Sequence, residues 1–183
     1  MSVDPQDRPL NPPAGQHRAC IGLGSNCDPA GNLPSALNRL RRRVAVEGVS
    51  GAWQSAAVGI ASPDFVNAAA LVRTALGSGE LARLLKQIEN DLGRTHGDAR
   101  NLVQIDLDLL VYDDQVLRDD LWDLAYRAVP VAELLPDLTG PGTRERLCLA
   151  AARLAAPGAI RPRPDILLDA APRTSRAGAR GSS

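Results

Sequence analysis

The order of apolar segments along the chain constrains the fold more than any other feature of this sequence. Two segments repeat apolar residues at helical spacing, and the segments around them are short apolar or β-branched runs typical of strands. In order, these are a strand at 19–23, a helix at 32–43, strands at 44–58 and 65–72, a helix at 78–92 and a strand at 103–112. This β-α-β-β-α-β order is typical of the ferredoxin-like arrangement, an antiparallel sheet with both helices on one face. The sequence therefore predicts an α+β fold of this kind.

Two glycines refine these boundaries. Gly93 directly follows the second predicted helix and is a suitable C-cap, because glycine adopts the left-handed conformation that often ends a helix. Gly48 interrupts the second predicted strand and indicates an irregularity there.

The ends of the chain differ in composition from this core. Residues 1–17 are rich in Pro, Asp, Gln and Asn, and residues 172–183 are mostly small and polar, so a disordered arm and tail are expected. Residues 18–171 are long enough to form a single domain. Prolines between 115 and 171 predict a loop-rich C-terminal part with short helices at 131–135 and 145–154.

Charge and cysteine content narrow the class of protein. Lys and Arg number 21, as do Asp and Glu, so the net charge favours neither nucleic acid nor an anionic membrane as a partner. The N-terminal residues lack a secretory h-region, and no apolar run approaches the ~20 residues of a transmembrane helix. The three cysteines have no zinc-like spacing, which favours reduced thiols and a cytoplasmic location. Protein partners are not indicated by the sequence.

Two aspartates stand inside the last predicted strand. Asp106 and Asp108 are two residues apart, so both side chains should point to the same face of the sheet. Such a pair forms the hard oxygen platform that Mg²⁺ prefers, together with substrate phosphates. The alternative is that the carboxylates face solvent or pair with arginine.

A polar loop leads from the second helix into this strand. Glu89 and Arg94 stand at the end of the helix, and His96 and Arg100 follow in the loop. Arg94 could hold a phosphate bidentately, or it could simply complement the helix dipole at the C-terminus. Gly24-Ser25-Asn26, after the first strand, indicates a turn but matches no established phosphate-binding fingerprint.

Five stretches of the sequence together resemble a known family, 6-hydroxymethyl-7,8-dihydropterin pyrophosphokinase of folate synthesis. They are IGLGSN at 21–26, SPDFVNAAALV at 62–72, LLKQIENDLGRTH at 84–96, IDLDLLVYDD at 105–114 and VPVAELLPDL at 129–138. The ordered set is more specific than any single stretch, and the resemblance covers residues 18–138.

The resemblance implies an enzyme that transfers the β,γ-pyrophosphoryl group of ATP to a reduced pterin and releases AMP. It implies two Mg²⁺ ions held by Asp106 and Asp108, with Arg94 as a further catalytic residue. A pterin would lie between Phe65 and Tyr126, with Ser55, Asn67 and Asp106 beside it. On the nucleotide side the resemblance implies Glu89 and Arg94, and His96, Arg100 and Arg118 are further candidates for contact with the nucleotide.

Four positions depart from the family pattern on the nucleotide side. Val103 and Leu124 stand where the family has arginines, Arg118 replaces a histidine, and His96 replaces a second arginine. Three aspartates, Asp119, Asp120 and Asp123, add negative charge nearby. Three interpretations therefore stay open. The chain is a pyrophosphokinase with a rearranged nucleotide clamp, a divergent paralogue in a related pathway of the methanopterin type, or a non-catalytic pterin-binding or scaffold protein.

Overall fold

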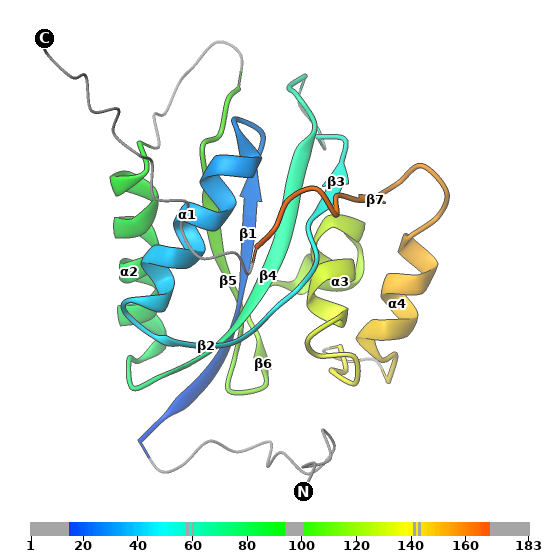
Figure 1. Ribbon diagram of the computed structural model, residues 1–183. Helices are drawn as coiled ribbons and strands as arrows, with labels where there is room; N and C mark the ends of the chain where they lie inside the picture. Colours follow the sequence, from blue (N-terminus) through cyan, green and yellow to red (C-terminus); the bar gives the residue numbers. More distant parts are fainter. Residues whose placement is uncertain are drawn as a thin grey trace, which may run out of the picture.

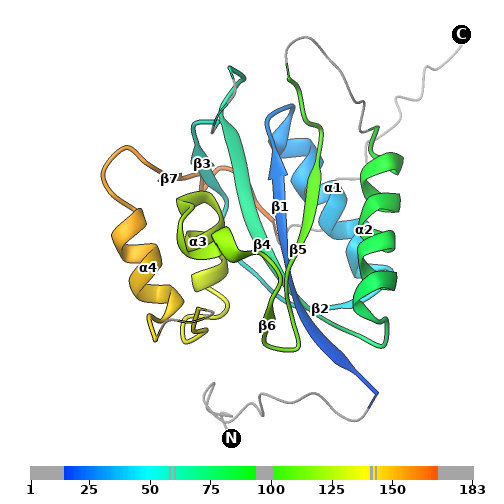
Figure 2. The same cartoon turned by 180° about the vertical axis from the view of Figure 1, so that it is seen from behind.

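One antiparallel sheet with helices on both faces forms the body of the molecule (Figure 1). The computed structural model describes residues 15–57, 59, 61–93, 101–140, 142 and 144–168. Helices α1 and α2 cover one face of the sheet, and α3 and α4 cover the other, as the view from behind also shows (Figure 2). The α1/α2 side is called the helix face below, and the α3/α4 side is called the cavity face.

The elements follow the predicted order, and their bounds are as follows. They are β1 (His17–Ser25), α1 (Pro29–Arg41), β2 (Ala45–Val49), β3 (Trp53–Ser55), β4 (Phe65–Thr74), α2 (Ser78–Asp91), β5 (Asp106–Tyr112), β6 (Gln115–Val116), η2 (Asp119–Trp122), α3 (Ala125–Ala132), α4 (Leu147–Leu154) and β7 (Arg161–Pro162). The strands are ordered β6-β5-β1-β4-β3-β7, and β2 also pairs with β4. With β5 and β4 on either side of β1, the core of the sheet has the ferredoxin-like arrangement, which confirms the predicted fold class.

The helix face is closed by an apolar core. On α1 and α2 the buried residues recur every three or four positions, so each helix presents one apolar stripe to the sheet. The strands contribute alternate residues to the same core, because successive side chains of a strand point to opposite faces. Fully or nearly fully buried members include Ile21, Leu23, Leu33, Leu37, Leu40, Val72, Leu81, Leu85, Ile105 and Leu107.

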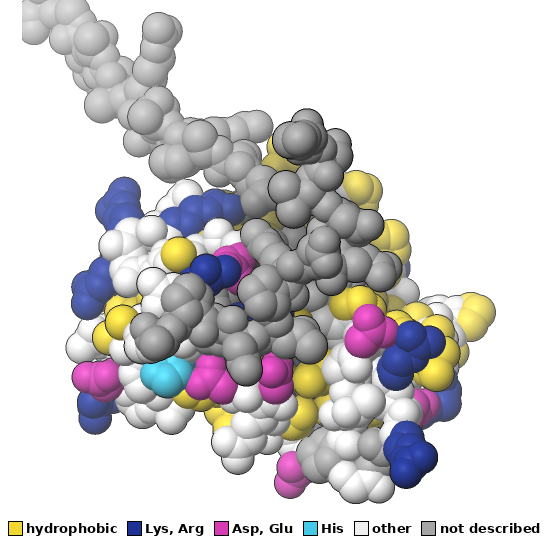
Figure 3. Space-filling view, turned by 90° about the horizontal axis from the view of Figure 1, so that it is seen from below, with side chains coloured by type: hydrophobic (Ala, Val, Ile, Leu, Met, Phe, Trp, Pro, Cys, Tyr) yellow, Lys and Arg dark blue, Asp and Glu magenta, His cyan; other side chains and the backbone are white. Residues whose placement is uncertain are grey.

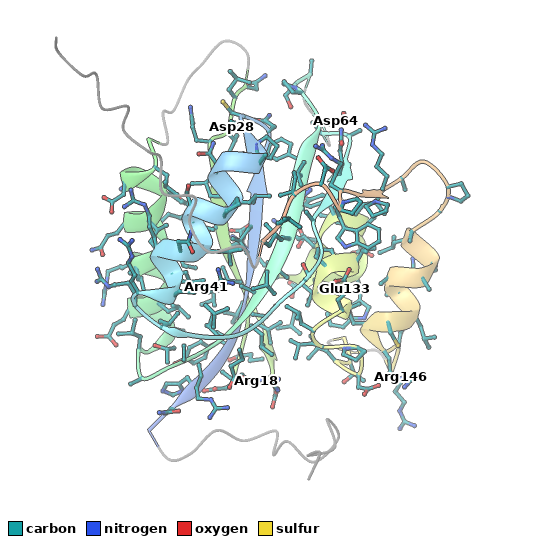
Figure 4. All side chains as sticks on the ribbon, in the orientation of Figure 1. Arg18, Asp28, Arg41, Asp64, Glu133 and Arg146 are labelled. Atoms are coloured by element: carbon teal, nitrogen blue, oxygen red, sulfur yellow. The ribbon has the colours of Figure 1, made fainter. Side chains whose placement is uncertain are left out.

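The cavity face is covered by the C-terminal helices. The predicted helix at 131–135 is wrong in its position, because α3 begins at Ala125 and includes Pro130. Pro130 removes one backbone hydrogen bond, but the buried side chains of Ala128, Val129 and Val131 hold the helix against the sheet. The predicted helix at 145–154 corresponds to α4. Glu133, labelled in Figure 4, fixes the end of α3 by accepting hydrogen bonds from the Trp53 indole N–H at 2.6 Å and the Gly51 N–H at 2.8 Å.

The predicted irregularities are present. Gly93 has a φ of 81° and its N–H bonds to the Asn90 carbonyl, which confirms it as the end of α2. A register shift between Val46 and Gly48 marks a β-bulge. The single strand expected at 44–58 is two strands, β2 and β3, joined by Ser50, Gly51 and Ala52.

The structure describes the two ends of the chain only in part. The predicted N-terminal arm, 1–17, overlaps β1, which begins at His17. Residues 1–14 and the predicted tail at 172–183 lie outside the described residues. Within the described part of the chain, no helix is long and apolar enough to cross a membrane. On the exposed part of the face in Figure 3, basic and acidic side chains are interspersed.

The segment after α4 passes around one edge of the sheet. β7 pairs with β3, and the Arg163 N–H donates to the Ala52 carbonyl at 2.8 Å. Further on, Ile166 and Leu168 are buried in the core of the helix face. This closing segment, 161–168, therefore links the two faces of the sheet and lies beyond the stretches that carry the family resemblance.

Candidate functional site

Strand register places three of the predicted site residues in one region of the cavity face. Gly24 of β1 pairs with Asp106 of β5 on one side and with Asn67 of β4 on the other. Neighbouring strands lie about 4.8 Å apart, so Asp106 and Asn67 stand roughly 10 Å apart across the glycine. Two residues back along β1, Gly22 is opposite Asp108. Asp106 and Asp108 thus share one face of the sheet, as their spacing predicts.

The glycines of β1 keep the space between these side chains open. A Cβ atom on Gly24 would lie 3.0 Å from the Asn67 Oδ1, and one on Gly22 would lie 3.0 Å from a Leu110 methyl group. Both approaches are tighter than ordinary van der Waals contact, so a side chain at either position would force its neighbour to move. The floor of the site is therefore backbone.

A cavity of about 170 Å³ lies over this floor, between the sheet and α3. Six of the residues predicted from the sequence line it together: Ser55, Phe65, Asn67, Asp106, Asp108 and Tyr126. The sheet supplies the first five and α3 supplies Tyr126, along with Arg127, Pro130 and Val131. The packing of α3 on the sheet therefore completes the cavity.

One end of the cavity combines aromatic side chains with a buried amide. Asn67 is 7% exposed, and its Nδ2 lies 3.4 Å from the Ser55 Oγ, which fixes the orientation of the amide. Phe65 is opposite Ser55 in the β3–β4 pairing. Burial raises the pKa of Tyr126 above its usual value, and the carboxylates of the cavity add to the shift against the opposing charge of Arg127. Near neutral pH this end therefore presents uncharged rings and one polar edge, a surface suited to a flat heterocycle.

The other end of the cavity is charged. Nη2 of Arg118 lies 2.6 Å from Oδ1 of Asp108, and Nη2 of Arg127 lies 3.0 Å from Oδ2 of the same carboxylate. Arg127 also pairs through Nη1 with Asp120 of η2, and its guanidinium carbon is 5.6 Å from the centre of the Tyr126 ring. Of the two interpretations of the aspartate pair, the arginine pairing is thus present at Asp108. Arg118, predicted on the nucleotide side, contacts one of the predicted metal carboxylates.

Glu89 lies apart from the cavity. It is completely buried on α2, on the helix face, where it accepts a hydrogen bond from the Leu107 N–H at 2.7 Å and pairs with Lys86 at 2.9 Å. Leu107 stands between Asp106 and Asp108, so Glu89 bonds the backbone that carries both carboxylates. The predicted contact of Glu89 with a nucleotide stays a prediction.

The segment before β5 is anchored by the turn after β1. Asn26 exchanges backbone and side-chain hydrogen bonds with Val103 and donates through Nδ2 to the Asn101 carbonyl at 2.9 Å. The Gly24-Ser25-Asn26 turn therefore positions the approach to Asp106. Val103 contributes backbone bonds here, and Leu124 is the N-cap of α3. The predicted residues Arg94, His96 and Arg100 lie outside the described residues.

Sequence reasoning did not assign the two floor glycines to the site, and it did not place Arg127 beside Asp108. The signal for the glycines was their spacing of two within a strand, which places both on one face. Arg127 directly follows Tyr126, but its reach to Asp108 depends on where α3 begins, and the prolines of this region obscured that boundary.

The carboxylates can be tested for their fit to a metal ion. Asp106 and Asp108 supply oxygen ligands on one face, as Mg²⁺ requires. Among the residues that the structure describes, no group of three or more His, Cys, Asp and Glu could hold a metal. The pair therefore fits a cation that brings most of its ligands from elsewhere, such as the phosphates of a substrate.

Fold and site together define an α+β protein with one cavity face. The cavity there has rings and an amide that suit a flat small molecule, and it also contains a carboxylate pair. Residues 20–136 match the family described as 7,8-dihydro-6-hydroxymethylpterin-pyrophosphokinase. The chain belongs to this family, in agreement with the resemblance found in its sequence.

Individual relatives agree with this assignment. A 2-amino-4-hydroxy-6-hydroxymethyldihydropteridine pyrophosphokinase of Synechocystis sp. is 33% identical over 144 residues, which cover 73% of this chain and 74% of the relative. One from Pseudomonas putida is 39% identical over 103 residues, which cover 55% and 86%. The crystal structure of wild-type Plasmodium falciparum HPPK-DHPS with pteroate matches with a TM-score of 0.64 at 9% identity, over 75% of this chain and 44% of that one. That similarity shows the fold, and this chain spans less than half of that protein.

Proposed function

We propose that this protein transfers pyrophosphate from ATP to 6-hydroxymethyl-7,8-dihydropterin, forming AMP and the pterin diphosphate in folate biosynthesis. The observation that carries the proposal is that Phe65, Asn67 and Tyr126 line the same cavity as Asp106 and Asp108. The names of the relatives and the family match support the same reaction.

The two ends of the cavity suit the two halves of this reaction. The rings of Phe65 and Tyr126 would lie against the faces of the pterin, and the Asn67 amide would hydrogen-bond its edge, with Ser55 holding the amide. The pterin hydroxymethyl oxygen would then face the carboxylate end. There it would attack the β-phosphorus of ATP. The bond from that phosphorus to the oxygen it shares with the α-phosphorus would break, AMP would leave, and the hydroxyl proton would pass to solvent water.

Catalysis of this kind depends mostly on positioning and on neutralising phosphate charge. We propose that Asp106 and Asp108 hold Mg²⁺ jointly with the ATP phosphates, two ions being expected from the family resemblance. The bound ions would neutralise the phosphates and polarise the bond to be broken. We propose that the nucleotide is contacted by Arg94, His96, Arg100 and Arg118. Glu89, also predicted on the nucleotide side, accepts a hydrogen bond from the strand that carries the carboxylates.

A coupled assay tests the proposal. The wild-type protein, mixed with ATP, Mg²⁺ and 6-hydroxymethyl-7,8-dihydropterin, should form AMP only when the pterin is present. Asp106→Asn should lower the rate by about 10²–10³-fold, as for other lost charge-stabilising groups. Phe65→Ala should raise the KM for the pterin by up to about tenfold, the equivalent of one lost ring contact, and leave the KM for ATP unchanged.

Other outcomes separate the alternatives. Pterin binding without ATP binding or AMP formation would contradict the proposed reaction and favour a pterin-binding protein. AMP formation with a different reduced pterin alone would indicate a divergent paralogue.

We also propose a cytoplasmic location. The three cysteines are all unpaired in the structure, which is their usual state in that compartment.

A further inference from the structure

One carboxylate of the proposed metal pair is already occupied by arginine. Both oxygens of Asp108 are bonded, Oδ1 to Arg118 and Oδ2 to Arg127, at 2.6 and 3.0 Å. The Asp108 and Arg127 side chains are 18% and 17% exposed, so this contact is largely shielded from water, whereas Arg118 is 47% exposed. Charge pairs are stronger where water is excluded. The Asp108–Arg127 contact is therefore the one that matters most to the charge of the site.

Arg127 bridges two elements at this point. Its Nη2 bonds Asp108 on β5, and its Nη1 bonds Asp120 on η2. Two carboxylates at this end, Asp108 and Asp120, bond the two guanidinium groups, and Asp106 lines the same cavity. Without Arg127, the like charges of Asp108 and Asp120 would lose the cation that they share, which is unfavourable until another cation arrives.

A divalent cation and the guanidinium groups compete for the same carboxylate. A cation bound at Asp108 would place two further positive charges beside Arg127 and Arg118, and this repulsion opposes binding of the cation alone. ATP changes the balance, because its triphosphate offers the arginines a new anionic partner with matching bidentate geometry. Arg127 lines the cavity, so the phosphates and its guanidinium can meet there.

We propose that Arg127 is a positioning residue with two successive partners: Asp108 in the nucleotide-free protein, and the nucleotide phosphates once a cation occupies Asp108. The inference rests on the proposed function for its second partner only. Arg127 keeps the carboxylate from taking up a cation before ATP is present. It also returns positive charge to a nucleotide side on which Val103 and Leu124 stand in place of arginines.

The test uses cation binding by the full-length protein without nucleotide. Mn²⁺, which replaces Mg²⁺ at oxygen sites and is visible by electron paramagnetic resonance, is the probe. Arg127→Met keeps an unbranched chain of similar reach but removes the charge, and it should raise Mn²⁺ affinity by about tenfold. The same variant should weaken ATP binding in the presence of Mg²⁺ by about tenfold or more, measured by calorimetry.

Two further variants keep the proposal falsifiable if Arg127→Met does not fold. Arg118→Met changes a half-exposed side chain and should raise Mn²⁺ affinity in the same direction but less. Arg153→Met is the matched control, because Arg153 is an exposed arginine on α4 that pairs with Glu145 outside the cavity. It should leave both affinities unchanged.

The outcomes divide clearly. Mn²⁺ affinity that stays the same or falls in both Arg127→Met and Arg118→Met overturns the proposal. Stronger Mn²⁺ binding with unchanged ATP affinity overturns the second partner. A wild-type protein that forms no AMP contradicts the proposed function. The Mn²⁺ measurement still decides whether Arg127 lowers the affinity of Asp108 for a cation.

Discussion

The two faces of the sheet use the same strands for different purposes. On the helix face, Leu107 of β5 is buried in an apolar core with α1 and α2. On the cavity face, Asp106 and Asp108 of the same strand line the site. The strand period of two separates these roles within three consecutive residues. Substitutions on the helix face should therefore change stability, and substitutions on the cavity face should change binding and catalysis.

The largest effect on stability is expected at Leu37, which is fully buried on α1. Leu37→Ala should lower the free energy of unfolding by about 3 kcal/mol, because it removes buried methyl groups and leaves a void. Urea denaturation measures this change. Leu149→Ala, at a 53% exposed position of α4, is the control and should cost less than about 0.5 kcal/mol. A raised KM for the pterin in folded Leu37→Ala would contradict the expectation that helix-face substitutions change stability alone.

Glu89 lies on the helix face but accepts a hydrogen bond from the backbone between the two carboxylates of the cavity face. Glu89→Ala should lower the free energy of unfolding by about 2 kcal/mol, because the Leu107 N–H loses its acceptor in a buried position. Glu89→Gln keeps an acceptor oxygen and should lose about half of that or less. Denaturation and the AMP assay should be run on both variants. Equal losses of stability in the two would contradict the hydrogen-bond explanation and point to the charge of Glu89.

The smallest effect concerns Cys20, a buried residue of the cavity face beyond the cavity itself. Burial raises the pKa of its thiol from 9.0 to about 12. The unfolded chain therefore loses this proton first, so the stabilising contribution is complete below pH 9 and is lost as the pH rises towards 12. Between pH 8 and pH 10 the free energy of unfolding should fall by about 1 kcal/mol more in the wild type than in Cys20→Ala.

Denaturation curves at the two pH values provide the measurement. In the folded protein a thiol reagent at pH 8 should label the half-buried Cys27 and Cys148 and spare Cys20. Rapid labelling of all three cysteines would indicate that the cavity face opens readily behind β1.

Much of the fold could be predicted because it depends on local periodicity. The spacing of Leu81, Leu85 and Ile88 specifies the buried stripe of α2, and the spacing of Asp106 and Asp108 places both on one face. Phe65, Asn67 and Tyr126 were located through resemblance to a family whose members share this order of motifs. Each of these features can be recognised within a short stretch of sequence.

The charged end of the cavity could not be predicted in the same way. Arg127 reaches Asp108 and Asp120 because α3 begins at Ala125 and tolerates Pro130, and this depends on packing against the sheet rather than on local preference. The hydrogen bond of Glu89 with the backbone N–H of Leu107 likewise joins two separate elements, α2 and β5, and no local pattern indicates it. Long side chains such as these bond partners that are distant in sequence. Their contacts therefore cannot be predicted from a short stretch of sequence.

The closing segment, 161–168, has a consequence for solubility. Edge strands expose unpaired N–H and C=O groups, and another chain can add to them as an extra strand. β7 and the Arg163 N–H occupy part of the β3 edge, while Ile166 and Leu168 anchor the segment in the opposite core. A chain shortened before Arg161 would present β3 as a bare edge beside uncovered apolar surface, a combination that promotes self-association. We therefore expect the segment to protect the sheet against aggregation, although it lies beyond the stretches that identify the family.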